Sequence, residues 1–555
     1  MKQATMAASS NWLYNLAKSH PKISEEIAPA KSSLQELLEY SKEQFDQVQG
    51  FFLEAGVKAH QFLLEAGEKL QDHYDKGLDA IPTDLLITAI ACTIMAMLLT
   101  VSIIRRIYER AQHKKLYGSN AFPPLVPGGV RKTTTALAGS NLPVYFKQCA
   151  DAVGPIFRLN TSFFQGPMVV AVGDVELAKE ILQDRKTKKP EESYASIASI
   201  AGGPNIMTSE GPLWKVSRKG VAPAFLKEYL DRMHQVSEHQ TEQWIQQTLH
   251  PLVKKNEAFD LGNEMVLLTL SIICESAFEY KIKDKEAKYL VEEFSIATKE
   301  FGSYDVGKPS TKGSKRGNVA RKRVQAVAKK IIKSYQRKDT GDKLYNTIIN
   351  RIVKNKHYEN DEHRAADIIM FLFAGLDQTA YSLAWTLFEL AKHPEVLTSL
   401  RQALNGKGDP ALVHDMLKDI LREGMRLHPV VPGAGVRTAG RDFYVKDSAM
   451  VIPKGSQIIF PSMVLTRNNV KDAEVFKPSR WKENPDNTFL HFSAGRRNCV
   501  GQSLALAEIT WALSRLCAEF KFKIVDEGRP EFCGTLKCVG TLLKAYRVSE
   551  ASIAN

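Results

Sequence analysis

The chain has 555 residues, of which 44% are hydrophobic and 25% charged, a composition that excludes a disordered or fibrous protein. Its seven cysteines are odd in number and include no Cys-x-x-Cys pair, which argues against a disulfide framework and against a structural zinc site. The net charge of +13 favours an acidic partner or an anionic membrane surface. Nucleic acid is the rival interpretation, but no zinc-finger, homeodomain or RNP pattern supports it.

Residues 1–84 differ in charge from the rest of the chain. They carry a net charge of −5, whereas the remaining residues carry +18. The stretch 34–74 has a helical, partly amphipathic pattern, with Leu37, Leu38 and Phe45 on its apolar stripe. We predict a helical extension on the lumenal side of a membrane. A targeting segment is disfavoured because the stretch is rich in acids and lacks arginine.

The next twenty residues, 85–104, contain no charged side chain. A helix rises about 1.5 Å per residue, so this length matches a hydrocarbon core of about 30 Å. A buried core helix is the alternative, although such helices rarely lack a polar face over so many turns. Arg105, Arg106 and Arg110 follow directly, while acids precede the segment. The positive-inside rule therefore predicts a single transmembrane helix with the following residues in the cytosol.

The rest of the chain is expected to form a hinge and one domain. Residues 105–130 are basic and contain AFPPLVPGG, which cannot continue a helix. From residue 131 to 555 no second linker interrupts the pattern. Strand-like runs (PIFRLN, PMVVAVG) come early, helical patterns dominate the middle, and further strand-like runs (MVIPKG, SQIIFP, FKFKIV) follow. The expected fold class is mostly α (α+β), with small antiparallel sheets.

A basic segment interrupts the helical middle. Residues 308–338 contain twelve Lys or Arg and no Asp or Glu. The first part (GKPSTKGSKRGN) predicts a flexible loop and the rest a basic helix. Both a solvated helix face and a contact with anionic lipid or a partner remain open.

A lone cysteine, Cys499, stands in the stretch HFSAGRRNCVG just before a long helical pattern. Lone cysteines are most often small buried apolar residues. Here flanking glycines permit close backbone approach, Arg496 and Arg497 add positive charge, and a helix N-terminus follows, all of which stabilise a thiolate. The thiolate could be a nucleophile with His491 as its base. It could also be a metal ligand: alone it does not close a zinc site, but it suffices as the axial ligand of haem iron.

This stretch resembles the haem-binding loop of cytochromes P450, Phe-x-x-Gly-x-Arg-x-Cys-x-Gly. The matching residues are Phe492, Gly495, Arg497, Cys499 and Gly501. The resemblance covers the chain from about residue 123 to the C-terminus and is absent from residues 1–84. It implies a P450-like haem domain at 131–555, in which Cys499 binds the iron of haem b.

Three other stretches resemble supporting motifs of the same family. Trp214 and Arg218 resemble its Trp-x-x-x-Arg helix, and the resemblance makes them ligands of the haem propionates. Arg437, Arg497 and, more weakly, His491 are further propionate candidates. Glu423 and Arg426 resemble the family's buried ion pair, and Arg480 in FKPSRW its third member. These three we interpret as structural residues, since a buried carboxylate between two arginines is costly to disrupt.

A long apolar helix, FLFAGLDQTAYSLAWTLFELAKHP, resembles the P450 helix that crosses over the haem. Small residues, Ala374 and Gly375, would leave space for dioxygen and substrate. Asp377 and Thr379 would open the helix locally and hold water for proton delivery. The family usually has threonine directly after the acid, but here Gln378 stands there. Glutamine cannot relay a proton as a hydroxyl does, so oxygen activation and reaction type are both in question.

The resemblance implies a membrane-anchored haem-thiolate monooxygenase. It would insert one oxygen atom of O2 into a small apolar substrate of the sterol, fatty acid, terpenoid or carotenoid class. Electrons would come from NADPH through a reductase-type flavoprotein, with cytochrome b5 as a further partner. Residues 190–210, with Ile197, Ile200 and Ile206, would line the pocket. The endoplasmic reticulum is the expected membrane and a plastid the other organelle. The alternatives are a P450-like isomerase or dehydratase acting on a peroxide, and a non-catalytic haem or membrane protein.

Overall fold

The computed structural model describes residues 121–137, 139–161, 167–301, 315–338, 346–406, 409–431, 433–483 and 490–548. The predicted N-terminal extension, the transmembrane helix at 85–104 and most of the hinge lie outside the described residues. So does the first part of the basic segment, residues 308–314.

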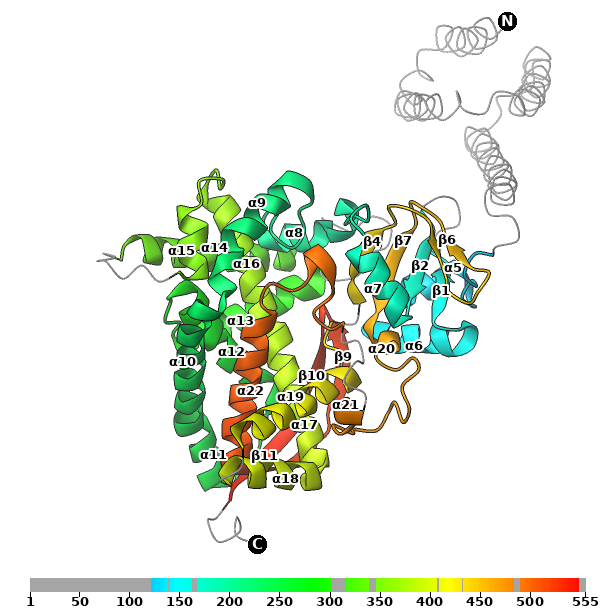
Figure 1. Cartoon of the computed structure of the whole chain (residues 1–555). Coiled ribbons are helices and arrows are strands. Elements are labelled where there is room, and N and C mark those ends of the chain that lie inside the picture. The colour runs from blue at the N-terminus through cyan, green and yellow to red at the C-terminus, as the bar shows by residue number, and fades with distance from the viewer. Residues whose placement is uncertain are drawn as a thin grey trace, which may run out of the picture. The chain divides into compact units, whose positions relative to one another are not determined.

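Helices make up most of the described chain and are gathered in one body, with the largest sheet beside them (Figure 1). The helices up to residue 301 are α5 (Gly129–Leu137), α6 (Leu142–Val153), α7 (Val175–Gln183), α8 (Ala195–Ala201), α9 (Gly211–Val221), α10 (Lys227–Trp244), α11 (His250–Lys255), α12 (Leu261–Phe278) and α13 (Asp284–Phe301). Those that follow are α14 (Lys315–Gln336), α15 (Ile348–Lys354), α16 (Asp361–Phe373), α17 (Thr379–Lys392), α18 (Pro394–Asn405), α19 (Pro410–Leu427), α20 (Ser462–Leu465), α21 (Arg480–Glu483) and α22 (Gln502–Glu519).

The main hydrophobic core is built around α12, α16 and α17. Within the described residues, two helical stretches are long and apolar enough to cross a membrane: Leu261–Phe278 and Asp361–Lys392. Most of their residues are buried inside the protein, which explains their composition, because a helix packed on all sides needs no polar face. The two stretches therefore belong to the core of the helical body.

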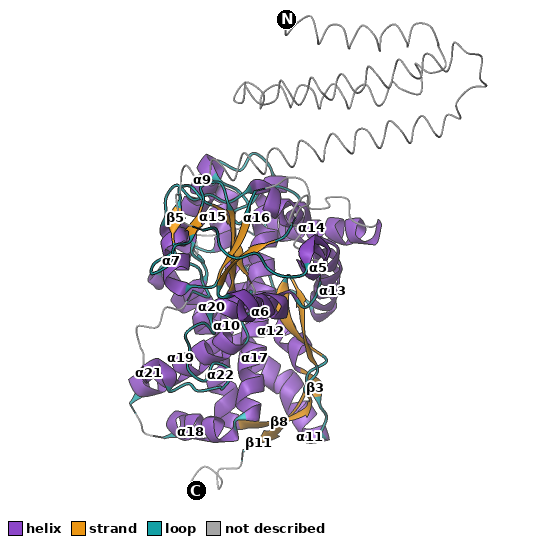
Figure 2. Cartoon of the chain, turned by 90° about the vertical axis from the view of Figure 1, so that its right-hand side faces the viewer, coloured by secondary structure: helices purple, strands orange, loops and turns teal. Residues whose placement is uncertain are grey.

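Four small sheets accompany the helices. The largest has the strand order β1 (Ile156–Leu159), β2 (Val169–Val172), β7 (Gln457–Pro461), β4 (Gly433–Thr438). A second joins β3 (Phe259–Asp260), β11 (Leu542–Arg547) and β8 (Phe520–Asp526), and Figure 2 shows it at one end of the body near α11 and α18. The two hairpins are β5 (Phe443–Tyr444) with β6 (Val451–Ile452), and β9 (Arg529–Cys533) with β10 (Thr535–Val539). Each predicted strand-like run contains one of these strands.

The prediction of purely antiparallel sheets is wrong for one pair. Strands β2 and β7 run parallel, with Val170 opposite Ile458. A parallel pair requires a long crossover connection, and here the crossover contains most of the helical body. Strand β4 then pairs antiparallel with β7 and sets Arg437 opposite Ile458.

The basic helix predicted after residue 314 is α14. Its inner face is buried through residues such as Val324, Ala328 and Ile331. Several of its cations pair with acids of the same body: Arg323 with Glu293 at 2.6 Å, Lys330 with Glu286 at 2.7 Å, and Lys329 with Glu362 at 2.6 Å. Part of the positive charge is therefore neutralised within the protein, which favours the interpretation of a solvated helix face over a lipid contact for these residues.

Candidate functional site

Cys499 lies in the loop between a short 3-10 turn (η5, Gly495–Arg497) and helix α22. Its N–H donates to the carbonyl of Phe492 at 2.8 Å and closes the loop. Gly495 has a φ of +69°, and a Cβ there would lie 2.5 Å from the carbonyl oxygen of Leu182. Both the backbone conformation and the close approach therefore require glycine at this position.

Arg218 of α9 is the cation that acts on the pKa of the Cys499 thiol. Its guanidinium donates to the backbone oxygen and to the side-chain oxygen of Asn498, both at 2.9 Å, and so holds the cysteine loop. Burial raises the pKa of the Cys499 thiol, while the Gly501 backbone N–H and Arg218 act to lower this pKa. We expected the surroundings to favour thiolate, but in the protein alone burial outweighs them. A coordinated metal ion reverses this balance, because it deprotonates a thiol ligand.

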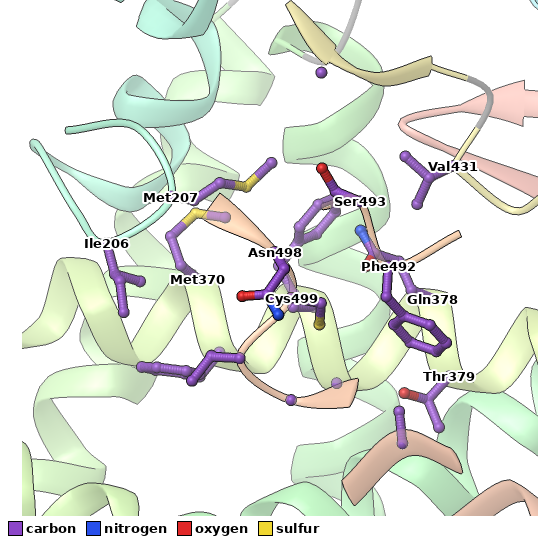
Figure 3. Close-up of a pocket in the computed structure, with 18 of the residues that line it drawn as sticks. Ile206, Met207, Met370, Gln378, Thr379, Val431, Phe492, Ser493, Asn498 and Cys499 are labelled. Atoms are coloured by element: carbon purple, nitrogen blue, oxygen red, sulfur yellow. The ribbon is translucent and has the colours of Figure 1, made fainter. Parts of the chain in front are cut away.

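The thiol faces a cavity of about 360 Å³. Figure 3 shows Cys499 and Asn498 among lining residues from several elements, including Met370 and Gln378. The walls are mostly apolar. The three isoleucines predicted to line the pocket, Ile197, Ile200 and Ile206, all do so. Phe492 and Gly501 from the cysteine loop also line it.

One edge of this cavity carries a cluster of cations. The Arg497 guanidinium stacks over the Trp214 ring, 3.8 Å from its centroid, and contacts Glu210 at 2.9 Å. Arg437 is 5% exposed and donates to its neighbour's carbonyl. Burial, Arg437 and Arg497 together hold the pKa of Lys189 well below its usual range. Cations gathered in this way provide a site suited to an anionic group.

His491 does not add to this positive charge. Its Nε2 contacts the carbonyl of Met425 at 2.7 Å, and burial lowers the pKa of the ring to about 4. The imidazole is therefore neutral at physiological pH. It fastens the cysteine loop to α19 rather than forming an ion pair with a carboxylate.

The apolar helix predicted to open locally does so. A π-turn (η4, Ala374–Gln378) separates α16 from α17. The Thr269 hydroxyl of α12 donates to the Leu376 carbonyl at 2.9 Å in this turn. A Cβ at Gly375 would lie 2.8 Å from the Ile273 side chain, so glycine lets α12 and the turn approach. Such π-turns are frequent at functional sites.

The polar side chains of the π-turn and of the adjoining Thr379 point in two directions. Gln378 and Thr379 line the cavity, together with Ala374 and Gly375 (Figure 3). Asp377 does not line it. Its carboxylate is buried and lies 3.1 Å from the ammonium of Lys537 on β10. Asp377 and Thr379 were predicted to hold water for proton delivery; in the structure only Thr379 faces the cavity, while Asp377 lies toward the β9–β10 hairpin.

The predicted structural ion pair is a larger cluster around Glu423. Its carboxylate, which is fully buried, accepts from Arg426 at 2.9 Å and from Arg480 at 2.8 Å. It also accepts from the Trp481 indole at 3.1 Å and the Lys477 backbone N–H at 2.9 Å. The cluster joins α19 to α21 and to Lys477 just before it, and the structure thus places all three predicted residues together.

The match to a protein family decides what this arrangement is. The family model for Cytochrome P450 matches residues 131–548. This chain belongs to the cytochrome P450 family. It is an oxidoreductase of that family with the P450 fold, mostly helical with small sheets.

Relatives of this P450 include enzymes named as hydroxylases. It is 27% identical over 358 residues to a cytokinin hydroxylase from Arabidopsis thaliana, covering 59% of this chain and 68% of that protein. It is 27% identical to a 3-beta-hydroxylase from Tanacetum parthenium, covering 66% and 79%. It is 24% identical to Protein LUTEIN DEFICIENT 5, chloroplastic, from Arabidopsis thaliana, covering 68% and 69%. Among solved structures, the cytochrome P450DA heme domain superposes with a TM-score of 0.65 at 21% identity, covering 78% of this chain and 99% of that one.

The residues of this P450 fit the haem group that the family implies. Among the residues that the structure describes, no group of three or more His, Cys, Asp or Glu side chains could hold a bare metal ion. A single thiol faces the cavity, as a metal that arrives with its own porphyrin donors requires. The cations at the cavity edge outnumber their one acidic neighbour, Glu210, and so suit the propionates.

Two residues of the site, Lys189 and Lys537, were not predicted from the sequence. Lys189 lies directly before Pro190, and nothing in that dipeptide signals a buried cation. Lys537 lies in a strand, β10, where the sequence pattern predicts a solvent-exposed lysine. Both positions depend on segments far apart in the chain: Arg437 and Arg497 act electrostatically on Lys189, and Asp377 pairs with Lys537.

Proposed function

We propose that this P450 is a membrane-anchored monooxygenase that inserts one oxygen atom of O2 into a small apolar substrate. Its electrons come from NADPH through a reductase-type flavoprotein. The observation that carries the proposal is the single thiol, Cys499, at an apolar cavity of about 360 Å³ with a cationic edge. Relatives named as hydroxylases support the reaction type.

The cofactor is haem b, and five side chains are assigned to hold it. Cys499 would bind its iron as the thiolate. Trp214 and Arg497, already stacked, would donate with Arg437 and Lys189 to the propionate carboxylates. Arg218 acts on the loop, through its two bonds to Asn498. Haem, when bound, supplies iron that activates O2 and transfers an oxygen atom to substrate.

The π-turn Ala374–Gln378 and the adjoining Thr379 carry the polar groups that transfer protons. The Thr379 hydroxyl and the Gln378 amide are its cavity-facing polar groups. The Thr379 Oγ1 can donate a proton into the cavity and receive another from water. Asp377, two residues away, replenishes it: once the contact with Lys537 opens, the carboxylate takes a proton from solvent and passes it to Thr379 through water. Gln378 orients water through its amide but holds no proton to give.

The apolar walls select the substrate class. Ile197 and Ile200 of α8 and Ile206 of the following loop face the cavity together with Met370 of α16. Exclusion of water by these side chains favours a sterol, fatty acid, terpenoid or carotenoid, in accordance with the hydrophobic effect.

A basic surface near the cysteine loop suits an acidic redox partner. Lys215 and Lys219 of α9 are exposed, and the Arg496 side chain is 44% exposed. Positive charge at this position steers an acidic flavoprotein or cytochrome b5 toward the edge of the site.

The function is tested with the purified full-length protein. The dithionite-reduced sample with carbon monoxide should give the red-shifted Soret band of a haem-thiolate, and NADPH consumption should depend on added reductase. A peroxide isomerase or dehydratase, which the glutamine at position 378 keeps open, would turn over a lipid hydroperoxide without reductase or O2. A protein that shows the band but neither turnover would contradict both enzymatic assignments.

Replacing Gln378 with threonine restores the usual residue of the family. We expect the share of NADPH electrons that reach product to equal or exceed that of wild type, by up to about threefold, because a second hydroxyl can relay protons. The measurement is peroxide released per NADPH consumed, with reductase and lauric acid as the probe. Gln402→Thr, at an exposed position of α18, is the control. A sharp loss of coupling in Gln378→Thr alone would instead show a specific role for the amide.

The anchor is assigned to residues 85–104, which lie outside the described residues. The proposal rests on the charge-free length and the arginines that follow it. The endoplasmic reticulum is the proposed membrane, and the chloroplastic name of one relative supports a plastid as the alternative. Full-length protein should stay in the membrane pellet after alkaline carbonate extraction, whereas residues 105–555 should be largely released. Retention of both would refute the assignment of 85–104 as the anchor.

A further inference from the structure

A buried acid on α16 contacts the loop that forms one wall of the cavity. Asp367 is fully buried, and its Oδ1 accepts the backbone N–H of Ile206 at 2.6 Å. Its other oxygen, Oδ2, accepts the hydroxyl of Tyr358. Asp367 and Ile206 are 161 residues apart in the chain. Asp367 itself does not line the cavity, so it touches the wall only from behind.

The loop that it contacts is ordered by its own bonds. The Asn205 side chain accepts the N–H groups of Met207 and Thr208, at 3.0 and 3.2 Å. The Thr208 hydroxyl accepts the Asn205 N–H at 3.2 Å in return. The N–H of Ile206 is left pointing outward from this closed loop, and Asp367 accepts it. One carboxylate thus fixes a unit of four residues, 205–208, to α16.

This unit presents side chains to the cavity. Ile206 and Met207 line it beside Met370 of α16 (Figure 3). The loop continues into Ser209 and Glu210, which contact Arg497 at 2.6 and 2.9 Å. Its far end is therefore tied to the cysteine loop, while Asp367 ties its middle to the apolar helix.

A carboxylate at this buried position carries a desolvation cost in free energy. Its neighbours on α16, Ile368, Ile369 and Met370, are apolar and buried, and burial raises the pKa of Asp367 despite its two hydrogen bonds. An apolar side chain would pack there at lower cost. What the carboxylate adds is a directional bond to one backbone N–H in the cavity wall.

We propose that Asp367 is a positioning residue that holds residues 205–208 as a fixed wall of the cavity and thereby limits which apolar substrates fit. The part about substrates rests on the proposed function, because it treats the cavity as the substrate site. The attachment of the wall to Asp367 does not depend on that function.

Hydrogen exchange tests the attachment. In full-length Asp367→Leu, the amides of residues 206–208 should exchange about tenfold to a hundredfold faster than in wild type, since the bond lost is one to a charged group. Asp367→Asn keeps an oxygen for the Ile206 N–H and should restore most of the protection. Ile368→Ala, next to it in the same helix and outside the cavity lining, controls for a general weakening of α16.

Azole binding tests the selectivity. Imidazole and clotrimazole both ligate haem iron through a nitrogen, but only clotrimazole is bulky enough to reach the wall. In the haem-loaded protein, the ratio of their Kd values, read from the Soret shift, should change about tenfold in Asp367→Leu. It should stay within about twofold of wild type in Ile368→Ala.

Each of the two measurements can contradict a different part of the proposal. If the exchange at residues 206–208 in Asp367→Leu matches that in Ile368→Ala, Asp367 does not hold the wall. If exchange accelerates but the azole ratio is unchanged, the wall does not set selectivity, and the proposal is overturned in that respect. Absence of a haem-thiolate band in wild type would defeat the proposed function, while the exchange data would still decide the attachment.

Discussion

Replacing Cys499 with serine is expected to abolish the haem-thiolate spectrum of the reduced carbon monoxide complex. A serine hydroxyl does not ionise in the range where a coordinated thiol does, so it cannot supply the electron density of a thiolate. The cavity walls and the cationic edge at Trp214, Arg437 and Arg497 remain, so some haem should still bind. We expect reductase-dependent NADPH use to fall by at least about a hundredfold. Haem content, measured separately as the pyridine complex, distinguishes loss of the ligand from loss of the cofactor.

Cys533→Ser is the matched control for this substitution. Cys533 is partly buried in β9 and does not line the cavity. Its replacement should leave the spectrum unchanged. A Cys499→Ser protein that retained the red-shifted band would disprove the assignment of Cys499 as the iron ligand and turn attention to another thiol.

Replacing Glu423 with glutamine is expected to be the most damaging change to stability. The carboxylate is fully buried and accepts from Arg426, Arg480, Trp481 and the Lys477 backbone. Glutamine leaves two guanidinium groups without their counter-charge and sets an NH2 group against donors. Disrupting a buried pair in this way costs about 3–5 kcal/mol. That is a large fraction of the stability of an ordinary protein, so we expect little folded protein and a much lower urea midpoint by circular dichroism.

Glu362→Gln provides the comparison. Glu362 is 65% exposed and pairs on the surface with Lys329, which is 41% exposed, at 2.6 Å. An exposed pair contributes about 0–1 kcal/mol, so the urea midpoint should hardly move. Equal midpoints for the two variants would show that the Glu423 cluster is not a stabilising element of this fold.

Local signals predicted much of the architecture. The strand-like runs contain strands, because alternation and β-branched residues act over a few neighbours. Helix α22 begins at Gln502, three residues after the cysteine, as the pattern indicated. The opening of the helix at Ala374–Gln378 follows from an acid, a hydroxyl and small residues in an apolar helix. These features depend on residues close together in the chain.

Directions of side chains were less predictable. The π-turn places Asp377 against Lys537 rather than in the cavity, and no pattern in either segment signals that pair. The parallel pairing of β2 with β7 brings together residues nearly three hundred positions apart. The pattern within each strand does not predict which other strand it pairs with.

The sequence alone predicted the family and the mostly helical class, which the family match and the structure confirm, and it indicated Cys499 and the other motif residues as the candidate site. Motif spacing carries this information, because turns, helix faces and ligands are set by near neighbours. Only the tertiary structure decided that Lys189 joins the cationic edge, that Lys537 holds Asp377, and that Asp367 supports the cavity wall at Ile206. Buried electrostatic contacts of this kind arise when packing excludes water from distant segments, and a single segment does not contain that information.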